Sequence, residues 1–205
     1  MAGRFITLEG GEGVGKSTQL KALAEALRRR GLEVVETREP GGSPGAEAIR
    51  ELLLEGPEDR WGAEAEALLF AAARADHVGK VIRPALEAGH WVLCDRFVDS
   101  SLAYQGGAGG LGLEAVRRIN AFGIGECFPD RTLVLMLAEA PERARSRDGT
   151  GGDRIGGRPA AYHAQVDAGF KAIAADEPHR VRLIDASGAP EAVTARLLAA
   201  LEDLL

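Results

Sequence analysis

The chain has 205 residues, a length that suits one domain. Hydrophobic residues make up 45% and charged residues 27% of it, as in a globular protein, and the net charge of −6 argues against a broad basic surface for a nucleic-acid polymer. No apolar run approaches the ~20 residues that span a bilayer, and no leader peptide precedes the first strand. We therefore expect a cytoplasmic protein without a membrane segment. The cysteines, Cys94 and Cys127, lack C-x-x-C spacing, which predicts reduced structural thiols.

The first 56 residues predict a strand, a glycine-rich loop, a helix, a second strand and a second helix. The apolar and β-branched run 4–9 ends at the glycines, and leucines at helical spacing follow over 17–31. A second strand is expected over 33–38, and after the turn residues EPGGSPG a helix is expected over 44–56. This order of elements is the context that a phosphate-binding loop requires.

The middle of the chain continues the alternation of helix and strand. Residues 62–90 predict a long helical region bent near Pro84, and 91–97 a buried strand that ends in charged residues. A glycine-rich stretch over 104–112 then leads into a helix that ends at about Gly125.

The last third contains one segment that does not fit a regular element. Residues 148–159 are rich in glycine and charge and have almost nothing apolar, which predicts a mobile flap or a disordered tip. The other predicted elements are a strand over 131–137, a helix beginning at 141, a helix ending at about 176, a strand over 180–186 and an amphipathic tail over 190–205. The pattern predicts an α/β doubly wound fold with about five parallel strands and helices on both faces.

The stretch GGEGVGKST over 10–18 has the spacing of a P-loop. In such a loop backbone N–H groups at a helix N-terminus face the phosphates. Lys16 would reach the β- and γ-phosphates, and the Ser17 hydroxyl would bind Mg²⁺. The predicted ATP-binding residues are Gly10, Gly11, Glu12, Gly13, Val14, Gly15, Lys16, Ser17 and Thr18.

Several classes of P-loop protein are disfavoured by what the sequence lacks. A GTPase needs an Asn-Lys-x-Asp motif to read its base, yet the one asparagine, Asn120, is followed by Ala121. The length also disfavours a large motor or recombinase ATPase. A small-molecule kinase remains, and it should carry a second set of residues for the phosphoryl acceptor.

Such a set lies in LCDRFVDSSLAYQ, residues 93–105. Asp95 and Arg96 lie at the C-terminal end of a predicted parallel strand, where doubly wound folds bind ligands. Asp95 would hold Mg²⁺ through water or orient the attacking oxygen, and Arg96 would clamp an acceptor phosphate. Taken alone, an Asp-Arg pair on the surface is an equally good reading.

The same run resembles the signature of the thymidylate kinase family: Asp-Arg-aromatic, two free positions, Ser-Ser, then Ala-Tyr-Gln. The resemblance extends from about residue 4 to 205. It implies a P-loop kinase fold with a small lid, in a single domain over 1–205 with the lid at about 147–159. It also implies a homodimer that uses ATP and Mg²⁺ to phosphorylate dTMP.

Further matches imply the acceptor site. TREPGG over 37–42 resembles a phosphate-contacting loop, which makes Arg38 a second clamp on the acceptor phosphate. LLFAAARADHV over 68–78 resembles the base-binding helix, in which Phe70 stacks on thymine and Arg74 donates to its carbonyl edge. By helical periodicity alone, Phe70 would be a core residue. The residues expected to line the nucleoside are Ser100, Ser101, Tyr104 and Gln105, with Tyr104 beside the sugar C2′, where it leaves no room for a ribose hydroxyl.

The glycine-rich flap would bring positive charge onto the transferring group and exclude water. GGDRI resembles the family's lid, which makes Arg154 the transition-state arginine, helped by Arg147. A carboxylate in the P-loop, Glu12, together with an arginine in the lid matches one bacterial type of the family. The chain departs from the lid pattern at Gly156, where glutamate is usual.

Glu12 is unexpected in a loop that holds phosphate, because a carboxylate repels it. Our hypothesis is that its side chain points away from ATP and accepts a hydrogen bond from the 3′-hydroxyl of the acceptor's deoxyribose. The alternative is a variable, solvent-facing loop position.

The sequence thus predicts an ATP:dTMP phosphotransferase for dTTP synthesis. The predicted catalytic residues are Lys16, Asp95, Arg96, Arg154 and Arg147, and the predicted metal ligands are Ser17 and Asp95. The first alternative is a kinase for another nucleoside monophosphate or a deoxynucleoside. The second is a P-loop switch that binds nucleotide without a small acceptor.

Overall fold

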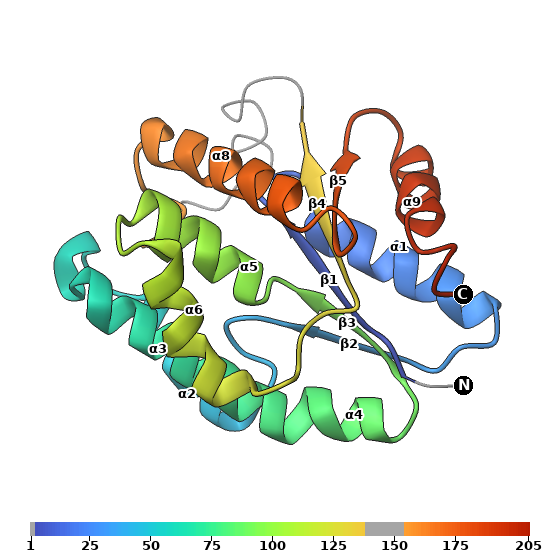
Figure 1. Cartoon of the computed structure of the whole chain (residues 1–205), viewed down its shortest axis with the longest axis horizontal. Helices are drawn as coiled ribbons and strands as arrows, with labels where there is room; N and C mark the ends of the chain where they lie inside the picture. Colours follow the sequence, from blue (N-terminus) through green and yellow to red (C-terminus); the bar gives the residue numbers. More distant parts are fainter. Residues whose placement is uncertain (1–2, 138–153) are drawn as a thin grey trace.

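A five-stranded parallel sheet runs through the centre of the computed structural model, which describes residues 3–137 and 154–205 (Figure 1). The strand order is β2-β3-β1-β4-β5, and every neighbouring pair is parallel, which confirms the predicted sheet. The strands are β1 (Phe5–Gly10), β2 (Val34–Arg38), β3 (Trp91–Asp95), β4 (Arg131–Met136) and β5 (Val181–Asp185).

Helices connect these strands and cover both faces of the sheet, as predicted (Figure 1). The α-helices are α1 (Lys16–Arg29), α2 (Pro44–Leu54), α3 (Ala63–His77), α4 (Arg83–Glu87), α5 (Val98–Ser101), α6 (Leu113–Ile124), α8 (Ala160–Asp176) and α9 (Pro190–Ala199). A 3₁₀ turn, η1, spans Glu58–Arg60, and π-helical segments span Val78–Ile82 (η2) and Leu102–Ala108 (η3). In the described part of the chain, no helix is long and apolar enough to cross a membrane.

Alternate residues of the strands enter different cores because successive side chains point to opposite faces. In β1, Ile6 and Leu8 pack with α1 and α9, whereas Phe5 packs against η2. In β4, Leu135 joins the first core, and Val134 packs with η3 and α8 on the other face. The sheet is therefore buried on both sides, as its near-continuous apolar strands predict.

After the adjacent strands β1 and β3, the chain turns towards opposite faces of the sheet. After β1 it enters α1 on one face, and after β3 it enters α5 on the other (Figure 1). The carboxyl ends of β1 and β3 are adjacent, since Leu8 is paired with Asp95. Such a divergence opens a crevice at the carboxyl edge of the sheet, where ligands of doubly wound folds bind.

The segment 98–108 differs from its prediction. We expected a glycine-rich stretch from 104, but the chain is helical through α5 and η3 as far as Ala108. Packing explains this, because η3 lies against α8 and Gly169 lets the two helices approach closely. A Cβ atom on Gly169 would lie 3.2 Å from the Cα atom of Ala103. Tertiary contacts thus override the low helix propensity of glycine.

The predicted flap over 148–159 lies outside the described residues up to 153. The expectation that the stretch buries nothing is wrong for its last part, because Arg154 and Ile155 are buried. Ile155 packs with Tyr104, Val166 and Phe170, residues that are distant in sequence. Short-range composition could not reveal those partners.

Candidate active site

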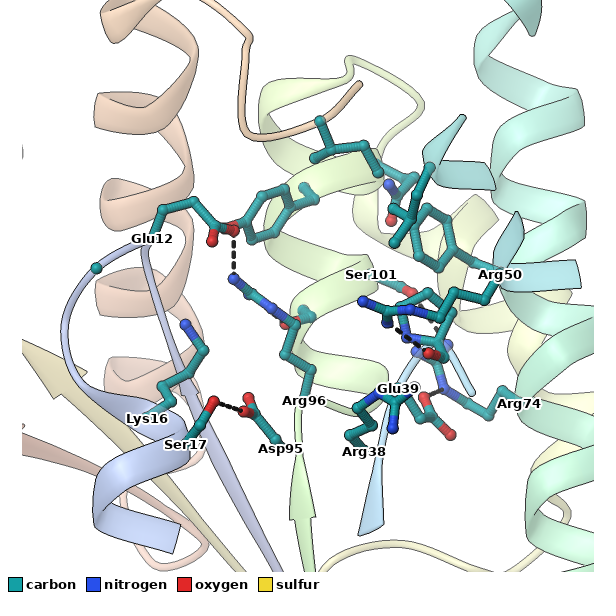
Figure 2. Close-up of a pocket in the computed structure, with 18 of the residues that line it drawn as sticks. Glu12, Lys16, Ser17, Arg38, Glu39, Arg50, Arg74, Asp95, Arg96 and Ser101 are labelled. Atoms are coloured by element: carbon teal, nitrogen blue, oxygen red, sulfur yellow. Dashed lines mark hydrogen bonds and ion pairs between the residues drawn. The ribbon is translucent and has the colours of Figure 1, made fainter. Parts of the chain in front are cut away.

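A cavity of about 310 Å³ lies at the carboxyl ends of β1, β2 and β3. Figure 2 shows Lys16 and Ser17 on one side of it, Arg38, Arg50 and Arg74 on the other, and Arg96 between them. The predicted residues that line it are Glu12, Gly13, Gly15, Lys16, Ser17, Thr18, Arg38, Phe70, Arg74, Asp95, Arg96, Ser100, Ser101, Tyr104 and Gln105. The fold therefore brings the predicted donor and acceptor residues into one cavity.

The P-loop joins β1 to the N-terminus of α1. Gly10 has a φ of 131°, and a Cβ atom there would lie 2.4 Å from the Leu135 carbonyl oxygen of β4, so the loop can begin so close to β4 only with glycine. Lys16, the first residue of α1, folds back and donates to the carbonyl oxygens of Gly10 (3.2 Å) and Gly11 (2.7 Å). Burial, with the nearby Arg96 charge, lowers the pKa of Lys16 to about 8.

Two oxygen ligands for a metal meet beside Lys16. The Ser17 hydroxyl, from the start of α1, donates to Asp95 Oδ2 at the end of β3 over 2.9 Å (Figure 2). A hydroxyl and a carboxylate are hard oxygen donors of the kind that bind Mg²⁺ together with phosphate and water. In the described part of the chain, no group of three or more His, Cys, Asp or Glu side chains could hold a metal alone. The predicted pair, Ser17 and Asp95, thus fits Mg²⁺ held jointly with a nucleotide.

Arg96 occupies the centre of the site. We predicted that the strand would run to residue 97, but β3 ends at Asp95. The reason is that the backbone of Arg96 is left-handed, with a φ of 69°. Its guanidinium donates to the Gly10 carbonyl oxygen (3.1 Å), to Ser100 Oγ (3.1 Å) and to Glu12 Oε1 (2.6 Å). It also lies over the Tyr104 ring, 5.0 Å from the centroid. These contacts hold one cation between the P-loop and the acceptor end.

The Glu12 side chain points from the P-loop towards Arg96 and Tyr104. Its carboxylate accepts from Arg96 and, at 3.4 Å, from the Tyr104 hydroxyl. The Arg96 charge lowers the pKa of Glu12, so the carboxylate is ionised at neutral pH. Burial raises the pKa of the Tyr104 hydroxyl, which keeps this group a donor.

The predicted base-reading residue Arg74 is hydrogen-bonded to other protein groups. It is buried, and it donates to Glu39 Oε2 (2.7 Å), Ser101 Oγ (2.9 Å), Asn120 Oδ1 and the Phe97 carbonyl oxygen (3.0 Å). Four of its five N–H donors thus have protein acceptors, which fixes the guanidinium but leaves few donors for a base.

The other predicted acceptor residues lie around Arg74. Phe70 is half-buried and both lines the cavity and packs against the core, so the two readings of this residue are compatible. Gln105 donates to Glu66 Oε1 over 3.1 Å, and Ser100 donates to Glu9 Oε2 over 2.5 Å. Arg38 lies at the rim and pairs with Glu47 over 3.0 Å.

Of the two predicted lid arginines, the structure describes Arg154, which lies away from Lys16 and Ser17 and bonds α3 and the end of α2. Arg147 lies outside the described residues. Arg154 is buried and donates to the Leu53 carbonyl oxygen (2.9 Å) and to Glu66 (2.5 Å), which also accepts from Arg158 (2.6 Å). Glu66 therefore connects α3 to the segment 154–158.

Sequence reasoning missed several residues of this site. Glu39, Arg50 and Ile155 line the cavity, while Glu9 and Glu66 support it from behind. Glu9 had a visible signal, because it is a carboxylate at the end of an otherwise apolar strand. Glu39 also had one, because it lies in the motif TREPGG. Glu66 had none, since its partners are far away in sequence.

Comparisons with known proteins point the same way as this geometry. A family model described as thymidylate kinase matches residues 8–197. A thymidylate kinase from Rhizorhabdus wittichii is 64% identical over the whole of both chains, and one from Bradyrhizobium diazoefficiens is 50% identical over 99% of this chain and 90% of that one. The crystal structure of thymidylate kinase from Ehrlichia chaffeensis aligns with a TM-score of 0.79 and 31% identity, covering 98% of this chain and 99% of that one.

These matches cover both halves of the cavity. The region 8–197 contains the P-loop with Lys16 as well as the acceptor-side residues from Arg38 to Gln105. The resemblance found in the sequence motifs is thereby confirmed over the full fold. The chain belongs to the thymidylate kinase family.

Proposed function

We propose that this chain transfers the γ-phosphoryl group of ATP to dTMP, giving ADP and dTDP. The observation that supports this most directly is the single cavity, which P-loop residues and the acceptor residues of the family signature line together. Transfer between two phosphates needs both nucleotides in line at short range, and a cavity that donor and acceptor residues share is the kind of site where this can occur.

The donor end would hold ATP through backbone N–H groups of the P-loop and through Lys16. When the triphosphate binds, Lys16 would exchange the Gly10 and Gly11 carbonyl oxygens for phosphate oxygens. Ser17 and Asp95 would hold Mg²⁺, which when bound neutralises charge on the β- and γ-phosphates.

The acceptor phosphate would lie between Arg96 and Arg38. A phosphate oxygen is already anionic at pH 7, so attack needs positioning and charge neutralisation more than a strong base. We assign Asp95 to the metal and to orientation of the attacking oxygen for that reason. Arg96 suits the binding of the acceptor phosphate because its guanidinium lies close to both the P-loop and Tyr104.

The nucleoside would occupy the deeper end of the cavity. Phe70 would stack on the thymine ring, while the remaining donor of Arg74 and the amide of Gln105 would read its polar edge. Tyr104 would pack against the sugar C2′, and Glu12 would accept from the 3′-hydroxyl. Ser100 and Ser101 would complete the wall, mainly by holding Arg96 and Arg74.

Arg154 remains our predicted transition-state arginine, with Arg147 as its helper. Its guanidinium is bound to Glu66 and the Leu53 carbonyl oxygen in the described conformation. This role therefore requires Arg154 to exchange those acceptors for a phosphoryl oxygen during the cycle.

We further propose that the protein acts as a homodimer in the cytoplasm. Helices α2, α3 and α6 are neighbours (Figure 1). Each has a large exposed apolar side chain: Leu52 of α2, Leu68 of α3 and Phe122 of α6, the last 99% exposed. A second copy would cover such a surface. Both cysteines are free thiols, which suits a reducing compartment.

One assay separates this function from its alternatives. ADP release from ATP and Mg²⁺ is measured with dTMP, dUMP, UMP, CMP, AMP and GMP in turn. We expect the highest kcat/KM with dTMP, because in the proposed arrangement Arg74 and Gln105 would donate to the carbonyl edge of the base and Tyr104 would pack against the sugar. Turnover restricted to AMP or GMP would point to another nucleoside monophosphate kinase. Nucleotide binding without turnover on any acceptor would point to a P-loop switch.

A further inference from the structure

A fully buried carboxylate, Glu9, lies directly behind the acceptor-phosphate clamp. It belongs to β1, and both of its oxygens accept hydrogen bonds. The Phe97 N–H donates to Oε1 over 2.7 Å, and the Ser100 hydroxyl donates to Oε2 over 2.5 Å. An ionisable group in a strand core costs free energy unless it is hydrogen-bonded. Both of its partners belong to the segment that carries Arg96.

Arg96 has a backbone conformation that must be held in place. Within residues 3–137 and 154–205, it is the one residue other than glycine with a positive φ, at 69°. This conformation costs free energy for a residue with a Cβ atom, and it persists where neighbours fix it. The Arg96 N–H donates to the Leu8 carbonyl oxygen over 2.9 Å, and the next N–H along the chain donates to Glu9. Strand β1 thus holds Arg96 on both sides.

The same carboxylate also fixes the Arg96 side chain. Ser100 Oγ, which donates to Glu9, accepts a hydrogen bond from Arg96 Nη1 over 3.1 Å. Ser100 Oγ therefore bridges Glu9 and the guanidinium, and Glu9 fixes the position of this oxygen whether its own side chain is ionised or protonated. Backbone and side chain of Arg96 are therefore oriented through one group.

We infer that Glu9 is a positioning residue for the acceptor phosphate, acting through Arg96 and Ser100. This inference rests on the proposed function, in which Arg96 binds the phosphate of dTMP. Glu9 is fully buried, so it acts on the acceptor through these two residues rather than by contact. Removal of the Glu9 carboxylate should weaken binding of the acceptor selectively. The proposed donor contacts come from Lys16 and Ser17, which belong to α1 on the other side of the P-loop.

Steady-state kinetics of the full-length protein test this inference. Glu9→Ala should raise the KM for dTMP roughly 10-fold while the KM for ATP stays within about twofold, because one hydrogen-bonded buried group is lost. Glu9→Gln should recover part of the loss, since its amide oxygen still accepts from the Phe97 N–H. Thr7→Val is the matched control: Thr7 is buried on the same strand and bonds Thr132, so its loss should lower stability and leave both KM values unchanged.

Ser100→Ala and the double variant Glu9→Gln/Ser100→Ala complete the experiment and also serve if Glu9→Ala does not fold. We expect the double variant to be no worse than the poorer single one, because both changes interrupt the same connection. Additive losses, equal rises in both KM values or an unchanged KM for dTMP in Glu9→Gln would each overturn the inference. If the wild type uses another nucleoside monophosphate instead, the proposed function fails. The role of Glu9 is then decided by measuring the KM for that acceptor and the KM for ATP in the same variants. Turnover on no acceptor would overturn both.

Discussion

At the residue scale, the polar side chains of the acceptor end are bound to one another before any ligand arrives. Arg74 has four protein acceptors, Gln105 is bound to Glu66, and Ser100 to Glu9. Side chains that are already fixed lose little conformational entropy when a ligand binds. A substitution in this network therefore affects neighbours as well as the residue that is changed.

Tyr104 provides the residue-scale test of sugar selection. Tyr104→Ala should raise kcat/KM for UMP relative to dUMP by roughly 10-fold, because the space beside C2′ is opened. The Tyr104 ring also lies against Arg96, so total activity should fall as well. Tyr104→Phe keeps the ring and should keep the wild-type ratio. An unchanged UMP to dUMP ratio in Tyr104→Ala would show that another residue selects the sugar.

Glu9 predicts how stability depends on pH. Burial, followed by the Asp99 charge, raises its pKa from 4.5 to about 8. Between these pH values the native state keeps a proton that the unfolded state releases. The free energy of unfolding therefore falls as pH rises through this range. Glu9→Gln cannot ionise, and its stability relative to wild type should improve by about 1–3 kcal/mol between pH 5.5 and 7.5.

Urea unfolding of wild type and Glu9→Gln at both pH values provides the measurement. Glu25→Gln on α1 is the control, because its carboxylate is exposed and 4.0 Å from Arg29. A difference between wild type and Glu9→Gln that is constant with pH would show that Glu9 keeps an ordinary pKa in the fold.

At the element scale, Glu66 joins three parts of the chain that the sequence separates. It lies on α3 and accepts from Gln105 of η3 and from Arg154 and Arg158 of the segment before α8. The segment 154–158 thereby closes one side of the acceptor cavity, where Ile155 reaches the lining. Its docking depends on a charge buried in α3.

Replacing that charge should release the segment. Glu66→Gln leaves the buried guanidinium of Arg154 without its carboxylate, which costs about 3–5 kcal/mol. We expect a lower urea midpoint and faster proteolytic cleavage near residue 154. Glu64→Gln is the matched control, since Glu64 is an exposed residue on the same helix. Equal stability of the two variants would show that Glu66 does not hold the segment.

The elements that sequence patterns predicted well are those whose signal is local. The P-loop is contiguous, and the apolar strands are visible in short windows, so both could be placed from the sequence. The helical character of 104–108 was missed because packing against Gly169 of α8 supports it. Propensity alone argues against a glycine-rich helix.

The candidate site was predictable to the extent that its residues belong to motifs. Asp95 and Arg96 were found because they lie at the C-terminal end of a predicted strand, and their partners on the P-loop were found independently. Glu66 could not be found, because its three partners are 39, 88 and 92 residues away. The ties of Arg74 to Glu39 and Asn120 were hidden for the same reason.

At the scale of the whole molecule, the exposed apolar residues of α2, α3 and α6 predict a dimer. Sedimentation equilibrium should give the mass of two chains for the wild type. Phe122→Glu should shift the mass toward one chain, because a buried interface would then contain an unpaired charge. Phe128→Glu is the control: this phenylalanine is also exposed but lies outside these helices. A wild type with the mass of one chain would contradict the proposed dimer.

Turnover also requires that the product leave, and the Glu12–Arg96 ion pair bears on that step. The carboxylate is 2.6 Å from the guanidinium. If Arg96 binds the acceptor phosphate as proposed, the phosphate would compete with an anion that is part of the protein. Binding at Arg96 would then be an exchange of partners, with a smaller net free energy than that of a phosphate meeting an unpaired arginine. Glu12 would pair with the guanidinium again as dTDP departs, and this competition would limit product inhibition.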